Sequence, residues 1–341
     1  MNRRLIRRAG RLALTLVGGA IFAGHALAWG STGHRIIGRL AIEAAPIELP
    51  AFLRSADAVQ AVGELAREPD RWKGAGKVHD SERDSAHFLD LGDDGRVLGG
   101  PALDALPASR EAYDTALRAV GADSWKAGWL PYAILDAWQQ LTKDFGYWRV
   151  DTAAARTVAD GAHRAWFAAD ASARQALILR DLGVLGHYVG DGSQPLHVSE
   201  HFNGWGAFPN PRGFTQDRVH APFEGIFVRD FVKLSAVRAD MTPFADCRCP
   251  IDQRVETYLA ATNRAVTPFY ELYKAGAFTG GDARGRAFAA QRLAAGASEL
   301  RDEVVDAWRA SARGQVGWPA VNVADVQAGK LDPFDSLFGA D

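Results

Sequence analysis

The sequence predicts an all-α protein with a single, mainly helical domain over residues 29–341. Two observations predict this fold class: apolar residues recur with helical spacing through most of the chain, and strand-like alternation is scarce. In the stretch 174–191, apolar side chains fall on one broad helix face. No internal repeat, low-complexity tract or long linker divides the chain. The segments rich in glycine, proline and asparagine read as loops at 91–108, 203–217 and 241–250.

The expected helices follow one another along the chain with recognisable boundaries. The segments with helical periodicity are 34–45, 131–145, 151–170, 174–191, 252–273 and 284–311. Pro46 cuts the first of these short, and Pro131 occupies the first turn of the second, where its missing N–H costs nothing. Residues from about 315 to 341 show no such periodicity, and we expect an irregular C-terminal tail packed on the surface.

The first 28 residues have the three parts of a secretory signal peptide. A basic stretch, MNRRLIRRAGR, precedes the apolar run LALTLVGGAIFAG, which is too short to span a bilayer comfortably. Ala26-Leu27-Ala28 is the small-x-small pattern that signal peptidase cleaves. We therefore expect cleavage after Ala28, a mature chain that begins at Trp29, and a periplasmic or secreted protein. An uncleaved membrane anchor is the alternative.

Composition restricts the function classes. Hydrophobic residues make up 48% and charged residues 23%, as is ordinary for a soluble globular protein. The net charge of -2 excludes the basic footprint of a tight duplex-DNA binder, although it allows a small cationic pocket. Only Arg248 separates Cys247 from Cys249, and a bridge that short would be strained. We expect these cysteines to be unpaired or structural, and bound metal to be one way of stabilising the fold.

Histidines and carboxylates recur at spacings that place them together. His187 and Asp191 are four residues apart in a predicted helix, so they share one face, and His197 follows on a turn. His220 and Glu224 form another pair with the same spacing.

Two further candidates lie upstream, Asp70 in EPDRWK and His87 in SAHFLD. Neutral imidazole with carboxylate is a typical zinc ligand set. A single pair also fits a buried histidine with a carboxylate partner. Several such pairs in a chain of nine histidines favour a metal site.

Five short strings together resemble a known superfamily, that of the zinc-dependent phospholipases C and the class I (S-one/P-one type) nucleases. The strings are WGSTGH, PDRWK, AHFLD, GHYVGDGSQPLH and HAPFE, in this order between Trp29 and about Gly225. The resemblance implies an all-α fold with three Zn²⁺ ions in a cleft.

Position by position, the resemblance also implies the zinc ligands. The first ion would take Trp29 (through its free α-amine and carbonyl oxygen), His34 and Asp191. The second would take Asp70, His87, His187 and the other oxygen of Asp191, which would bridge the two ions. The third would take His197, His220 and Glu224. A free α-amine titrates near neutrality and can therefore bind metal uncharged.

The resemblance further implies roles at four positions near the metals. Asp70 would orient the attacking water or accept its proton. Lys73 stands where the nucleases carry an arginine facing the phosphate; it keeps the charge and loses the bidentate fork, and a solvated surface lysine is the alternative. Phe88 and Asp90 would stack on and read a base, although Phe88 could equally belong to the core.

The five motifs carry features of both the nucleases and the phospholipases, so the resemblance leaves the substrate class open. The interval of five residues from Trp29 to His34 and that of 23 from His197 to His220 resemble the nucleases. Glu224 and the string HAPFEGIFV resemble the phospholipases, whereas Arg71 stands where those enzymes have a headgroup-binding tyrosine. We favour a single-strand-preferring endonuclease and 3′-nucleotidase.

Three expectations about partners follow from that preference. The partner is single-stranded nucleic acid or a nucleotide, and no stable protein partner is expected. A phospholipase C that binds a phospholipid headgroup is the alternative. A secreted zinc protein without turnover is a more remote one.

Overall fold

The computed structural model describes residues 29–339, so the predicted signal peptide lies outside the described residues. This part of the chain is mainly helical, as predicted. Its main helices are α1 (Gly30–Glu43), α2 (Ala56–Leu65), α3 (Glu68–Arg71), α4 (Lys77–Asp84), α5 (Arg110–Arg118), α6 (Ser124–Ala127), α7 (Leu130–Thr157), α8 (Gly161–Ser193), α9 (Val228–Phe231), α10 (Leu234–Asp240), α11 (Ile251–Asn263), α12 (Val266–Lys274) and α13 (Ala283–Ser311).

Shorter elements connect or extend these helices. They are the 3₁₀ turns η1 (Ala51–Arg54), η2 (Ser85–His87), η3 (Leu103–Ala105) and η4 (Pro195–His197), the π-helical turn η5 (Pro222–Phe227), strands β1 (Gln315–Val316) and β2 (Val321–Asn322), and helices α14 (Val323–Gln327) and α15 (Phe334–Phe338).

Two predicted helices are each broken into two. The segment 151–170 is interrupted between α7 and α8, because the Asp160 side chain accepts hydrogen bonds from the N–H groups of Ala162 and His163 and so begins a new helix. The segment 252–273 is interrupted between α11 and α12. Pro268 lies in the first turn of α12, and proline in a continuous helix would clash with the preceding turn.

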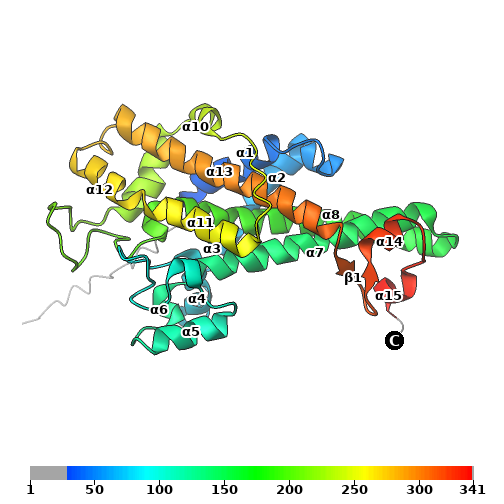
Figure 1. Ribbon diagram of the computed structural model, residues 1–341. Coiled ribbons are helices and arrows are strands. Elements are labelled where there is room, and N and C mark those ends of the chain that lie inside the picture. The colour runs from blue at the N-terminus through cyan, green and yellow to red at the C-terminus, as the bar shows by residue number, and fades with distance from the viewer. Residues whose placement is uncertain (1–28, 340–341) are drawn as a thin grey trace, which may run out of the picture.

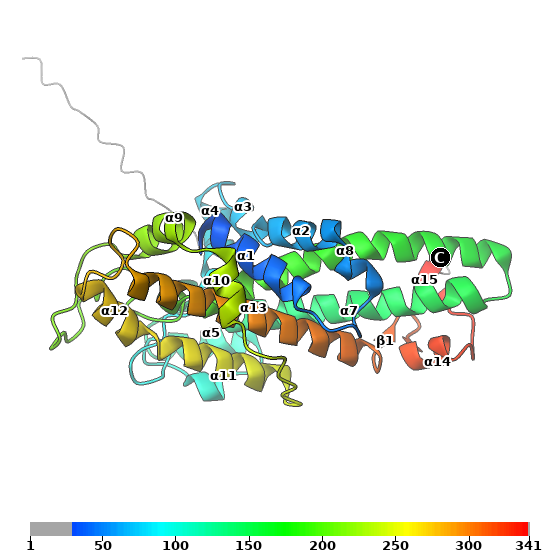
Figure 2. The same ribbon diagram turned by 90° about the horizontal axis from the view of Figure 1, so that it is seen from above.

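The long helices α7, α8 and α13 form the body of the molecule. Figures 1 and 2 show them packed side by side, with α7 and α8 joined by the tight connection at 158–160. Helices α1 and α2 cover one side of α8, and α4, α5 and α6 gather beside the start of α7. The buried apolar side chains of these helices make one large core, and the C-terminal half of α8 lies inside it.

The C-terminal segment is more regular than predicted. Strands β1 and β2 pair antiparallel, and Val316, Val323 and Val326 pack against α7 and α8 in a second apolar cluster. Apolar contacts with Val150 and Phe167 thus order a segment whose own sequence carries no clear periodicity.

Cys247 and Cys249 form a disulfide, so the expectation of unpaired cysteines is wrong. Arg248 between them has a φ of 51°, in the left-handed region. This backbone conformation folds the chain so that the Cα atoms of the two cysteines lie 5.1 Å apart, within the range for a bridge.

Among residues 29–339, no helix is both long and apolar enough to cross a membrane.

Candidate metal centre

The C-terminal end of α8 provides the centre of the site. His187 and Asp191 lie one turn apart on the same face, as predicted, with Nε2 of His187 3.4 Å from Oδ2 of Asp191. His34 of α1 stacks on His187 with 3.9 Å between ring centroids, and its Nε2 lies 3.5 Å from Oδ1 of Asp191. Gly190 permits this approach, because a Cβ there would lie 3.0 Å from Nδ1 of His34. The three side chains form a fully buried group of possible metal ligands.

A second group shares His187 with the first. His87 of η2 places its Nδ1 2.9 Å from Nε2 of His187 and 3.0 Å from Oδ2 of Asp191. Asp70 of α3 lies with its Oδ1 4.0 Å from the same His187 nitrogen. Asp191 therefore directs one oxygen toward His34 and the other toward His87 and His187. This is the arrangement expected of a carboxylate that bridges two cations.

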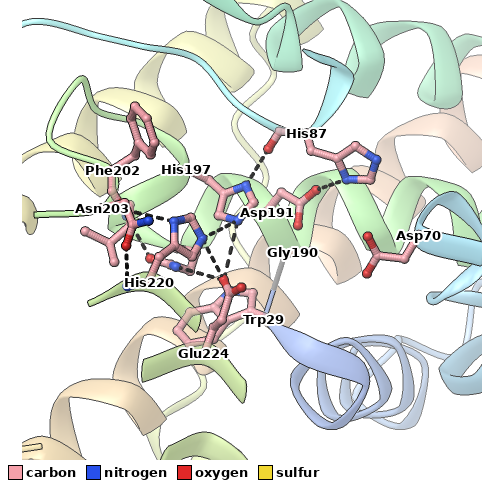
Figure 3. A network of polar contacts seen from close by, with 12 residues as sticks. Trp29, Asp70, His87, Gly190, Asp191, His197, Phe202, Asn203, His220 and Glu224 are labelled. Atoms are coloured by element: carbon pink, nitrogen blue, oxygen red, sulfur yellow. Dashed lines mark hydrogen bonds and ion pairs between the residues drawn. The ribbon is translucent and has the colours of Figure 1, made fainter. Parts of the chain in front are cut away.

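The third group combines η4 with the π-helical turn η5. His220 and Glu224 keep their spacing of four residues, with 2.8 Å between Nε2 and Oε2, and His197 lies 3.5 Å from the same oxygen. Figure 3 shows the three side chains converging on one point. Gln194, which is fully buried, donates a hydrogen bond of 3.2 Å to Oε2 of Glu224. Gln194 is not among the site residues predicted from the sequence, although its position just before Pro195, in the turn that carries His197, is a signal for it.

The hydrogen bonds of the third group determine which imidazole nitrogens face its centre. Nδ1 of His197 donates to the carbonyl oxygen of His87 at 2.6 Å, and Nδ1 of His220 donates to that of Phe202 at 2.9 Å. Since a carbonyl only accepts, each neutral ring presents its Nε2 lone pair to the centre. The two Nε2 atoms lie 3.0 Å apart beside the Glu224 carboxylate. Lone pairs and a carboxylate this close repel one another unless a proton or a metal cation lies among them.

Buried polar atoms without hydrogen-bond partners indicate that the other two groups also lack a ligand that would pair with them. Both ring nitrogens of His34, Nε2 of His87 and Oδ1 of Asp191 are buried and make no hydrogen bond to the described residues. Leaving such groups unpaired costs about 1–3 kcal/mol each. Their concentration at one place, together with the imidazole and carboxylate chemistry, fits metal binding.

The electrostatics favour neutral imidazoles. Burial lowers the pKa of His34 and His87 well below the usual range and lowers that of His187 to about 3. Burial, with the nearby Asp70, raises the pKa of Asp191 well above its usual range. A bound cation would act in the opposite direction, because it favours the charged form of Asp191.

Trp29 lies at the start of α1, next to these groups. Its indole is fully buried and donates a 2.7 Å hydrogen bond to Oγ of Ser193 at the end of α8. The backbone of α1 passes so close to the turn η5 that a Cβ at Gly30 would lie 3.3 Å from the carbonyl oxygen of Glu224. The structure thus brings the side chains of the eight other predicted ligands into three groups. Figure 3 draws Trp29 together with Asp70, His87, Asp191, His197, His220 and Glu224.

A cavity of about 460 Å³ opens beside the second and third groups. Its lining includes His87, His197 and His220 together with Lys73, Phe88, Asp90, Trp125, Lys126 and Phe202. We call it the aromatic cavity.

Of the four positions predicted to act on the substrate, Lys73, Phe88 and Asp90 line the aromatic cavity, whereas Asp70 does not. Phe88 is only partly buried, so it is not a simple core residue. Nζ of Lys73 lies 3.0 Å from Oδ1 of Asp70 while the side chain faces the cavity. Burial, with the nearby Glu200, raises the pKa of Asp90 to about 8, so its carboxyl group can donate a hydrogen bond at neutral pH.

Other aromatic and histidine side chains near the motifs have structural roles. His201 stacks on Trp205 with 3.7 Å between ring centroids, and its Nδ1 donates to the Trp205 carbonyl oxygen. Trp205 is buried and donates to the carbonyl of Pro209. Trp205 therefore belongs to the core.

Comparison with known proteins adds no identification: no family model, curated protein or solved structure matches the chain. The functional argument therefore depends on the residues and the geometry described above.

We expect Zn²⁺ to stabilise the protein more at pH 7.5 than at pH 5.0. Because the buried histidines have lowered pKa values, the unfolded chain takes up protons on them at a higher pH than the folded protein does. Their contribution to the free energy of unfolding is therefore fully present above about pH 6.5 and is lost as the pH falls toward 3. The raised pKa of Asp191 has the opposite effect on the stability of the metal-free protein, because protonation of this carboxyl group favours the folded state. Protons therefore compete with Zn²⁺ for Asp191, and this competition weakens as the pH rises.

The measurement is the melting temperature with and without Zn²⁺ at the two pH values. Ca²⁺, which prefers oxygen ligands, is the control and should give little shift. A zinc-dependent shift of equal size at both pH values would contradict the expected competition with protons.

Proposed function

We propose that this protein is a zinc-dependent phosphodiesterase, most specifically a nuclease that prefers single strands. The observation that carries the proposal is the continuity of the three ligand groups: the first two share His187, Asp191 faces both, and residues of the second and third line one cavity. A structural zinc site needs four ligands in a closed shell. A set of eight side chains in adjoining groups, open to a cavity, is instead typical of a catalytic centre with several metal ions.

When bound, Zn²⁺ would supply a Lewis acid for the phosphate and would lower the pKa of a coordinated water to about 7. The chain itself supplies charge and orientation. The Lys73 ammonium faces the cavity, where it can attract an anionic ester and fix the position of Asp70. Asp70, with one oxygen among the ligands, is placed to accept a proton. The carbonyl partners of His197 and His220 hold those rings with Nε2 inward.

The lining of the aromatic cavity favours a nucleotide over a choline headgroup. A quaternary ammonium group needs aromatic faces without a competing positive charge. Lys73 and Lys126 line the cavity together with Asp84 and with Asp90, whose pKa burial raises to about 8, so positive charge prevails there and would repel such a cation. The same lysines attract phosphate, and Phe88 offers a partly exposed ring on which an unpaired base can stack.

The function also explains why export would precede activity. Under this proposal the protein is processed to begin at Trp29 and works in the periplasm or outside the cell. The freed α-amine would complete the first ligand group, which otherwise contains only His34, His187 and Asp191.

Phe88→Ala should raise KM for single-stranded DNA by about 10- to 100-fold, the equivalent of about 1–3 kcal/mol for one stacked base. The experiment compares single-stranded DNA, duplex DNA, RNA, 3′-nucleotides and phosphatidylcholine vesicles, with Zn²⁺ and after chelation. We expect single strands to be cut much faster than duplex and all activity to stop on chelation.

A small phosphodiester without a nucleobase is the control, and both proteins should hydrolyse it about equally with the same zinc content. Cleavage of phosphatidylcholine without nuclease activity would replace the proposal with a phospholipase C. Loss of both substrates together in the Phe88→Ala protein would show that Phe88 stabilises the fold and does not bind a base.

A further inference from the structure

A second cavity, of about 650 Å³, adjoins the segment 83–87, and residues of this segment also line the aromatic cavity. Helices α7 and α8 form its floor, and residues from α3–α4 and α5 form its walls. We call it the arginine groove, and its defining residues are Trp72, Arg83, Arg110, Trp129, Arg180 and Tyr188.

Three guanidinium groups of the groove lie on tryptophan faces. Arg83 and Arg180 lie over the ring of Trp72, at 5.1 and 5.6 Å from its centroid. Arg110 lies over Trp129 at 4.2 Å. A guanidinium held in this way keeps its N–H edges available for an anion, and its outer face can stack on a base.

These arginines are not neutralised by the side chains that the structure describes around them. Within that part of the chain, Arg83 and Arg110 make no ion pair, whereas Arg180 pairs with Asp181 at 3.1 Å. Burial and the neighbouring Asp144 raise the pKa of Asp181 to about 8, which weakens its charge at neutral pH. Asp136 is the other acidic residue in the lining. The groove is therefore net positive.

The groove adjoins the metal centre. The ring of Tyr188 lines the groove and lies 5.6 Å, between centroids, from the rings of His87 and His187. Trp72 follows Asp70 by two residues. The segment 83–87 gives Arg83 to the groove and His87 to the aromatic cavity, so an extended ligand could contact both.

We propose that the arginine groove binds the phosphates of the single strand beyond the nucleotide held at Phe88. This inference rests on the proposed nuclease function and specifies its substrate: an extended strand and not only a nucleotide. Three guanidinium groups on two separate tryptophans exceed what one phosphate monoester or one lipid headgroup would use. A backbone with one charge per nucleotide matches such a spread of positive charge.

The test is the dependence of activity on strand length in Arg83→Ala/Arg110→Ala. In the wild type, kcat/KM should rise about tenfold or more from a dinucleotide to a decanucleotide, and the double variant should lose this gain. Arg284→Ala/Arg313→Ala removes the same charge at exposed sites outside the groove and is the control. Zinc content and dinucleotide cleavage report whether the metal centre is intact.

A second readout does not require catalysis. Binding of a fluorescent decathymidylate with hydrolysis-resistant phosphorothioate linkages to the zinc-loaded protein should weaken about tenfold in the groove variant. The slope of the logarithm of the binding constant against the logarithm of the salt concentration should become shallower by about 0.7 per lost phosphate contact, or about 1.4 for two. Unchanged binding, salt slope and length dependence would overturn the groove proposal. If the wild-type protein binds the strand through these arginines but cleaves no phosphodiester, the nuclease function is overturned. The arginine groove would then still be a binding site for single strands.

Discussion

Asp191→Asn should weaken metal binding at the first two groups by about 100- to 4,000-fold and lower phosphodiester hydrolysis at least as much. The two oxygens of Asp191 lie 3.5 Å from His34 and 3.0 Å from His87, in a fully buried place. Removing one charge of a buried ionic contact costs about 3–5 kcal/mol, and 1.4 kcal/mol corresponds to a factor of ten. Zinc titration against a competing chelator measures this loss directly.

Asp151→Asn is a matched control on α7. Asp151 is also fully buried, and its oxygens make no hydrogen bond to the described residues. Burial and Asp170 raise its pKa to about 8, so at neutral pH it is mostly protonated and asparagine resembles it. This variant should keep its zinc and its activity within about twofold. Similar, mild effects of both substitutions would show that Asp191 does not bridge metal ions.

The helical fold and the pairs within one helix could be predicted because their causes are local. The spacing of His187 and Asp191 alone places both side chains on one face of α8, and this is what the structure has. The breaks at Asp160 and before Pro268 were missed, although both residues are visible in the sequence. The apolar periodicity on either side continues without a change of phase that would reveal them.

Features made by contacts between distant segments could not be predicted from spacing. The Cys247–Cys249 bridge depends on the left-handed backbone of Arg248, which an arginine rarely adopts. The arginine groove joins Arg83, Arg110 and Arg180 from three helices, and none of them lies in a motif. Tertiary packing alone brings such residues together.

One residue added before Trp29 in the processed protein should remove one of three zinc ions and lower activity about 100-fold. An added residue converts the α-amine into an amide, whose nitrogen has no lone pair for a metal, whereas a free amine titrates near 8 and can bind uncharged. Trp29 lies beside the ligand groups, so we expect the added residue to affect the nearest zinc ion and not the rest of the fold. Its indole is anchored on Ser193, and the α1 backbone beside it lies against the Glu224 carbonyl. Native mass spectrometry of the two proteins counts the bound zinc.

Trp29→Phe in a chain that begins at residue 29 separates the amine from the indole. This variant keeps the amine and loses the hydrogen bond to Ser193, which contributes about 1 kcal/mol. It should be less stable and still hold three zinc ions, while the extended chain should be stable and hold two. Three zinc ions and full activity in the extended chain would show that the N-terminal amine is not a ligand. The buried Trp29 would then be explained by its packing against Phe223, and the first group by its side chains alone.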